Sequence, residues 1–207
     1  MGRRPLAVAL AGAVLAGCGG GGESSRTTTT AAPTTTVAPT TTTLADLGRL
    51  FVRMPPRPGF TPVPEKRGPF TLEGYLRDFS DEPVEERALL SAAGFVQGSS
   101  RAWADRASRP TTLAVFIFEF QEGADLGPVR DQLLRHGRGV TRFDVPSIAG
   151  ATGVSAFVAT QSARERAHEI GFVRGSRLFV VAAQHANLQA STDLVIDMAK
   201  AQAELVS

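Results

Sequence analysis

Residues 112–121 constrain the fold most, because they form one almost continuous apolar segment of strand length. The even-numbered side chains, which would share one face of a strand, are Ala114, Phe116, Phe118 and Phe120. The odd-numbered ones, which would share the other face, are Val115, Ile117, Glu119 and Gln121. Successive side chains of a strand point to opposite faces of its sheet, and both sets are apolar in the first half of this segment. The pattern predicts a central strand with both faces covered.

The remaining elements predict an α+β domain. We expect further strands at residues 95–104, 153–160, 167–174 and 177–184, the last two joined by a hairpin turn at Gly175. Capping and periodicity predict helices at residues 81–93, 126–136 and 189–206, and a short one at 46–53. Short links favour antiparallel pairing, so we expect an antiparallel sheet of about five strands with two or three helices packed on it.

The first 17 residues have the composition of an export signal. Arg3 and Arg4 precede an uncharged run, which ends in Leu15-Ala16-Gly17-Cys18. This box resembles the lipobox of bacterial prolipoproteins, which implies cleavage between Gly17 and Cys18 and a diacylglyceryl group, with palmitate-like chains, on Cys18. The alternatives are an ordinary secretory signal and an uncleaved membrane helix, although the run is short for a span.

Residues 18–44 are expected to form a lipidated, disordered linker before a single domain at residues 45–207. Residues 27–43 are mostly Thr, interrupted by Pro33 and Pro39, and such segments cannot offset the entropy of ordering. The linker is a stalk that either accepts O-linked sugars or is an unmodified spacer. We therefore expect the domain at the extracytoplasmic face of the cell membrane, held by its lipid.

Charge and cysteine content exclude several classes of function. The 22 basic residues become 20 once Arg3 and Arg4 leave with the signal, which equals the 20 acidic residues. The mature chain is formally neutral, so nothing indicates nucleic-acid binding. Cys18 is the only cysteine, which excludes a disulfide within the chain and, after lipidation, a thiolate metal site.

Four short phrases are similar to ones that recur in uncharacterised lipoproteins of high-GC Gram-positive bacteria. They are Gly94-Phe95, Arg101-Ala102-Trp103, Phe143-Asp144-Val145-Pro146 and Phe172-Val173-Arg174-Gly175. The element order over residues 80–207 also resembles the PsbP-like α/β sandwich that some of these lipoproteins adopt. The resemblance implies a location and a fold, and it implies no catalytic residues.

The chain contains no GxSxG, HExxH, Walker or GxGxxG motif, so we expect no catalytic residue, metal or cofactor. His168 and His185 should meet at one end of the last hairpin. There they could act in a hydrolase, or bind a metal with Glu165 or Glu169. The competing interpretation is that both histidines are solvated strand ends.

Trp103 is the only tryptophan and follows Arg101. These two residues, with His168 and His185, are the speculative ligand contacts, whereas core packing is the simpler role for Trp103. The expected function is a non-enzymatic binding or accessory module of the cell envelope, with a protein, glycan or lipid partner. The alternatives are a hydrolase using His168 or His185, and a lipid-transfer protein with an apolar cavity under residues 112–121.

Overall fold

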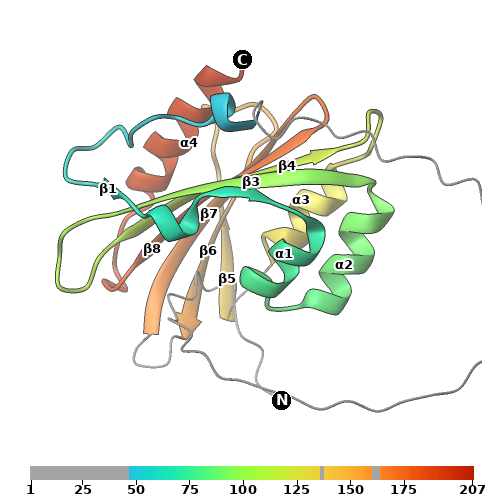
Figure 1. Ribbon diagram of the computed structural model, residues 1–207. Helices are drawn as coiled ribbons and strands as arrows, with labels where there is room; N and C mark the ends of the chain where they lie inside the picture. Colours follow the sequence, from blue (N-terminus) through green and yellow to red (C-terminus); the bar gives the residue numbers. More distant parts are fainter. Residues whose placement is uncertain (1–46, 136–137, 160–163) are drawn as a thin grey trace, which may run out of the picture. The chain divides into compact units, whose positions relative to one another are not determined.

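The computed structural model describes residues 47–135, 138–159 and 164–207, which form an antiparallel sheet flanked by helices (Figure 1). The signal, Cys18 and the linker lie outside these residues, as do His136 and Thr160, the expected ends of one helix and one strand. The strands are β1 (Thr61–Pro62), β2 (Gly68–Phe70), β3 (Phe95–Ala104), β4 (Thr112–Phe120), β5 (Arg138–Phe143), β6 (Thr152–Ala159), β7 (Arg164–Arg174) and β8 (Arg177–His185). The α-helices are α1 (Leu72–Asp78), α2 (Pro83–Ala92), α3 (Gly127–Leu133) and α4 (Asp193–Leu205), and the 3-10 helices are η1 (Leu47–Leu50) and η2 (Pro64–Lys66).

The expected α+β class is confirmed, but the expected numbers of strands and helices were wrong. The described sheet has eight strands, in the order β1-β3-β4-β8-β7-β6-β5 with β2 also paired to β3, and four α-helices are present among the described residues. The three additional strands, β1, β2 and β5, are short or irregular, and two of them contain proline, which hides strand periodicity. The hairpin between β7 and β8 is confirmed, with Gly175 at φ +56°.

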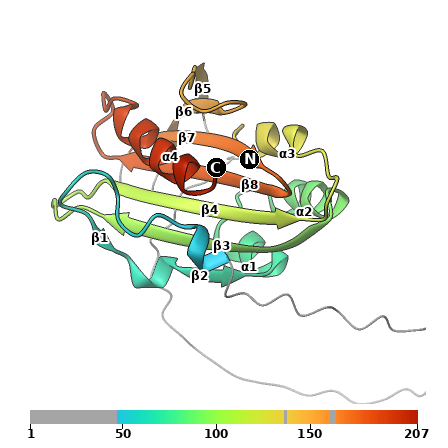
Figure 2. The same cartoon turned by 90° about the horizontal axis from the view of Figure 1, so that it is seen from above.

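Strand β4 lies between β3 and β8, so the predicted central position is confirmed. One face of the sheet is covered by α4 and η1, and Val115 and Ile117 of β4 point into that layer. The other face is covered by α1, α2 and α3, and receives Phe116 and Phe118. Figures 1 and 2 show the two layers, which we call the α4 face and the three-helix face.

Both edges of the sheet are poor templates for adding another strand. At one edge β1 and β2 are only two and three residues long. At the other edge β5 shifts register between Arg138 and Thr141, and Gly139 there has φ +63°. Short strands and bulges protect edges from pairing with other chains.

Residues 47–60 form an N-terminal strap across the α4 face. Gln202 of α4 is fully buried, accepts from the Val52 amide at 3.2 Å and donates to the Leu50 carbonyl. Arg101 of β3 donates to the Val52 carbonyl at 3.0 Å, and its guanidinium lies 5.0 Å from the centre of the Phe51 ring. The first and last described elements are therefore held together by buried polar contacts.

Candidate functional site

The register of the sheet gathers polar side chains at one end of the α4 face. One row of paired residues crosses strands β6, β7, β8, β4 and β3. In that order the residues are Ser155, His168, Ala183, Leu113 and Trp103. Partners across a sheet share a face, so these residues form one row. His185 lies in the next row, opposite Arg166. Sequence reasoning brought the two histidines together correctly, and their ring centres are 5.6 Å apart.

His168 is held by hydrogen bonds at both ring nitrogens. Its Nε2 lies 3.0 Å from the Ala190 carbonyl, and its Nδ1 lies 2.6 Å from Ser155 Oγ. Because a carbonyl only accepts, Nε2 carries the proton, and Nδ1 accepts from the Ser155 hydroxyl. The ring thereby connects β6 to the segment that precedes α4. Ser155 was missed because its partner depends on the β6–β7 register, which has no local sequence signal.

His185 and Trp103 each bury a polar atom that has no hydrogen-bond partner among the described residues. These atoms are His185 Nε2 and Trp103 Nε1. Burial, and then the neighbouring His168, lower the pKa of His185 to about 4, against the opposing effect of Asp105. Burial also lowers the pKa of His168, with a smaller contribution from Arg166, although the bond to Ala190 acts in the opposite sense. Both rings are therefore neutral near pH 7.

The interpretation of the two histidines as solvated strand ends was wrong. His168 is 2 % exposed and His185 is 8 % exposed, because β7 and β8 carry them under the layer that contains α4. Glu165 bonds Gln184 on the opposite face, and Glu169 contributes to a cavity there. Neither carboxylate can join the histidines. In the described ranges, no group of three His, Cys, Asp or Glu is arranged to hold a metal.

The three-helix face buries ionisable groups of a different kind. Tyr75 of α1 is 1 % exposed and Glu86 of α2 is also 1 % exposed. Burial raises the pKa of Tyr75 well above its ordinary value, with further contributions from Glu86, by charge and hydrogen bond, and from Glu169. A cavity of about 20 Å³ lies among Tyr75, Phe116, Phe118 and Glu169. It has room for about one water molecule.

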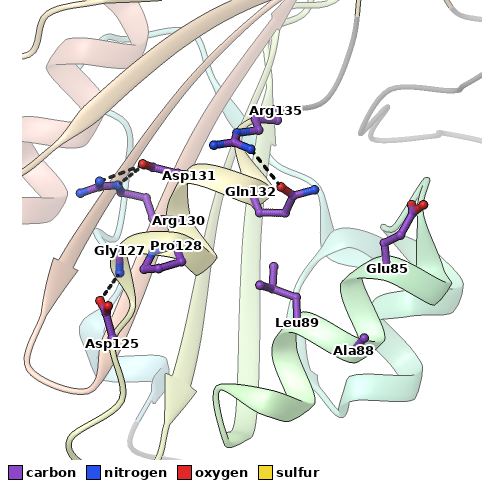
Figure 3. Close-up of a pocket in the computed structure, with 10 residues that line it drawn as sticks. All are labelled: Glu85, Ala88, Leu89, Asp125, Gly127, Pro128, Arg130, Asp131, Gln132 and Arg135. Atoms are coloured by element: carbon purple, nitrogen blue, oxygen red, sulfur yellow. Dashed lines mark hydrogen bonds and ion pairs between the residues drawn. The ribbon is translucent and has the colours of Figure 1, made fainter.

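An open groove of about 830 Å³ runs between α2 and α3 on the outside of the three-helix layer (Figure 3). Its α2 wall contains Glu85, Ala88 and Leu89, and its other wall is made by seven of the residues between 125 and 135. This volume lies within the range of ordinary ligand pockets, although open polar grooves are less selective than enclosed ones. None of the four residues proposed from the sequence lines the groove.

Several charges of the α3 wall are already engaged by neighbouring groups. Asp125 Oδ1 accepts from the Gly127 amide at 3.1 Å, at the start of α3. Arg130 pairs with Asp131 at 2.8 Å and donates to the Gly150 carbonyl at 2.7 Å. Arg135 has a marginal bond of 3.5 Å to Gln132. Arg130 is therefore held by two neighbouring groups, whereas Arg135 has only this marginal bond.

Comparison with known proteins adds little to this description. No protein-family model matches the chain, and no curated protein does. One solved structure, of an uncharacterized protein from Mycobacterium smegmatis, covers 79 % of this chain and 94 % of its own, with 17 % identity and a TM-score of 0.44. A match this distant supports no inference about family or function. No helix of the described part is long and apolar enough to cross a bilayer.

Proposed function

We propose that the chain is a membrane-anchored extracytoplasmic lipoprotein whose domain is a non-enzymatic binding module of the cell envelope. The observation that carries the binding role is the open groove between α2 and α3. The groove lies on the surface, and it leaves the hydrophobic clusters on both faces of the sheet packed. The support for the anchor is the box Leu15-Ala16-Gly17-Cys18. Two acyl chains suffice for stable membrane attachment.

The anchor is tested with the full chain in a bacterial host supplied with labelled palmitate. We expect the label on the wild-type chain, which should sediment with membranes, and no label on Cys18→Ala. Cys18→Ser, which retains a hydroxyl in place of the thiol, is the matched control and should also remain unlabelled. Equal labelling of wild type and Cys18→Ala would contradict the proposed anchor.

The binding role is tested by placing a photo-cross-linking residue at Ala88, on the wall of the groove, in the full chain in intact cells. The control position is Glu204, which is exposed on α4. We expect a discrete adduct from position 88 and none of the same mass from position 204. Failure to obtain any adduct specific to position 88, in cells that retain the lipidated protein, would contradict a binding role for this groove.

The hydrolase alternative has one specific observation in its favour, the short contact between Ser155 Oγ and His168 Nδ1. However, Ser155 is 4 % exposed, and the other nitrogen of His168 is occupied by Ala190. A nucleophile and its base must both reach a substrate. Ser155→Ala therefore tests the alternative: if the chain hydrolyses generic ester substrates, the rate of this variant should fall to the rate of the uncatalysed reaction.

The lipid-transfer alternative needs a continuous apolar cavity under the sheet strand at residues 112–121. The cavity beside Phe116 and Phe118 has a volume of about 20 Å³, and a buried acyl chain requires many times the volume of one water molecule. This observation favours a surface groove over an internal lipid site.

A further inference from the structure

The groove between α2 and α3 presents two opposite charges on different walls. Glu85 belongs to α2 and Arg135 follows α3; Figure 3 shows the Glu85 carboxylate pointing outward from α2 and the Arg135 guanidinium beside Gln132. Within the described part of the chain, no ion pair joins them, and the Glu85 carboxylate has no hydrogen bond. Arg135 has only the marginal 3.5 Å bond to Gln132. Both charges are therefore available to a ligand in the groove.

Farther along the groove the lining is small and only weakly apolar. Ala88 and Leu89 form the α2 wall, and Pro128 lies on the α3 wall. The Gln132 amide also lines the groove, and it can both donate and accept a hydrogen bond. A backbone peptide group has the same two capacities, so Gln132 can bind main chain of any sequence.

These lining residues disfavour the other common classes of ligand. No aromatic side chain is present among the ten lining residues, so a sugar ring finds no stacking surface there. A docked helix needs a row of apolar anchor sites, and the groove offers only the three apolar side chains already named. Acidic residues alternate with basic ones, which disfavours a polyanion such as nucleic acid.

An extended polypeptide can pair with the Glu85 and Arg135 side chains at the same time. Neighbouring side chains of an extended chain point in opposite directions. A basic residue that reaches Glu85 would therefore place the next or preceding side chain on the opposite wall, beside Arg135. Charge complementarity then requires that neighbour to be acidic.

We propose that this groove binds an extended segment of a protein partner through adjacent residues of opposite charge, one paired with Glu85 and the other with Arg135. The proposal rests on the binding function above and specifies its ligand as polypeptide. Small residues beside the charged pair pack on Ala88 and Pro128, and the segment's main chain bonds the Gln132 amide.

The test is selection of short random linear peptides, displayed on phage, against the full lipidated chain in detergent micelles. We expect enrichment of peptides with a basic residue next to an acidic one. Glu85→Lys makes both walls positive and should shift the enrichment to paired acidic residues. Arg135→Glu makes both walls negative and should shift it to paired basic residues.

Two variants serve as controls for this selection. Ala88→Trp fills the groove from an exposed helix position and should abolish enrichment, while thermal unfolding shows whether the domain is intact. Glu204→Lys makes the same charge reversal at an exposed position of α4, away from the groove, and should leave the selected sequences unchanged. Each charge reversal in the groove should weaken the binding of a wild-type-selected peptide at least about tenfold.

Enrichment that survives Ala88→Trp, or that ignores both charge reversals, would overturn the proposal. Selection of no peptides at all would also overturn it. If position 88 still cross-links in cells, and the adduct resists proteases but yields to glycosidases or lipid extraction, the groove binds another class of partner. The peptide proposal then fails while the binding function stands.

Discussion

Each face of the sheet covers a hydrophobic cluster, but the two faces bury different polar groups. The α4 face ends in neutral imidazoles and an indole, held beneath the strap and the segment before α4. The three-helix face instead buries a phenol with carboxylates among tightly packed aromatic rings. The first face depends on long-range polar contacts, whereas the second depends on ring packing. This difference predicts that the faces respond to different perturbations.

The largest expected difference between the faces comes from adding one methyl group to a glycine under an aromatic ring. A Cβ on Gly98 would overlap the Phe70 ring on the three-helix face, and a Cβ on Gly153 would overlap Phe143 on the α4 face. Phe70 is confined by Tyr75 and other rings, whereas Phe143 is half-buried. We expect Gly98→Ala to cost about 3 kcal/mol and Gly153→Ala about 1 kcal/mol.

Urea unfolding of the two glycine variants measures this difference. Gly48→Ala is a matched control, because a Cβ there meets nothing within 4 Å. Equal losses at Gly98 and Gly153 would show that the two faces are equally tightly packed.

The N-terminal strap should detach from the α4 face while the rest of the domain stays folded. Gln202→Ala leaves the Val52 amide and the Leu50 carbonyl without their buried partner, which costs about 2 kcal/mol. We expect faster hydrogen exchange at Val52 and faster tryptic cleavage at Arg53, with unchanged exchange in α1. Uniformly faster exchange in both layers would mean that the strap and the three-helix face unfold together.

The limits of stability at low and high pH should report on different faces. His185 binds its proton near pH 4 when folded but near 6.5 when unfolded, so the unfolded chain takes up more protons between these values. Stability from the α4 face is thus full above pH 6.5 and falls toward pH 4, by at most about 1.4 kcal/mol per pH unit. Tyr75 has a raised pKa, so its contribution is full below pH 10 and falls above it.

Separate substitutions should remove the loss of stability at low pH and the loss at high pH. His185→Phe keeps a ring and should flatten the acid limb, and Tyr75→Phe should flatten the alkaline limb. Tyr75 is the only tyrosine, so ultraviolet absorbance follows its ionisation directly. An acid limb unchanged in His185→Phe would assign the loss of stability to other groups.

The smallest effects on stability should come from exposed ion pairs in the helical layers on the two faces. Arg57 pairs with Asp197 at 2.6 Å over the α4 face, and Arg87 pairs with Glu73 over the three-helix face. Exposed pairs contribute little because water screens them. We expect Asp197→Ala and Glu73→Ala each to cost less than about 0.5 kcal/mol in thermal unfolding. A loss above about 1 kcal/mol at Asp197 would show that this pair holds the strap.

Local patterns predicted the elements that carry strong periodicity. Strand β3 begins and ends at the expected residues, and β4 and β8 differ from expectation by one residue at one end. Helix α1 and strand β2 were missed, because proline and short length obscure the signal between residues 55 and 78. Strand β5 was missed because its bulge breaks the alternation.

The site was less predictable than the fold. Alternation along β7 correctly separated His168 from Glu169, and the hairpin brought His168 to His185. The Ser155 contact and the burial by the segment before α4 depend on packing between elements distant in sequence. The groove depends on the relative placement of α2 and α3, which no short segment encodes. Glu85 and Arg135 look like ordinary solvated helix residues until that placement is known.

The Gln202 contact has a consequence for the order in which the chain can mature. Its two partners lie 150 and 152 residues earlier in the sequence. A ribosome makes the strap well before α4, so the Leu50 carbonyl and the Val52 amide lack their Gln202 partner until most of the domain has been synthesised. Contacts of such separation form late, since the closure of a long loop is entropically costly. Until α4 has been made, the apolar side of the strap has no surface to pack against. A chaperone that protects this chain must therefore cover the strap for longer than the other segments.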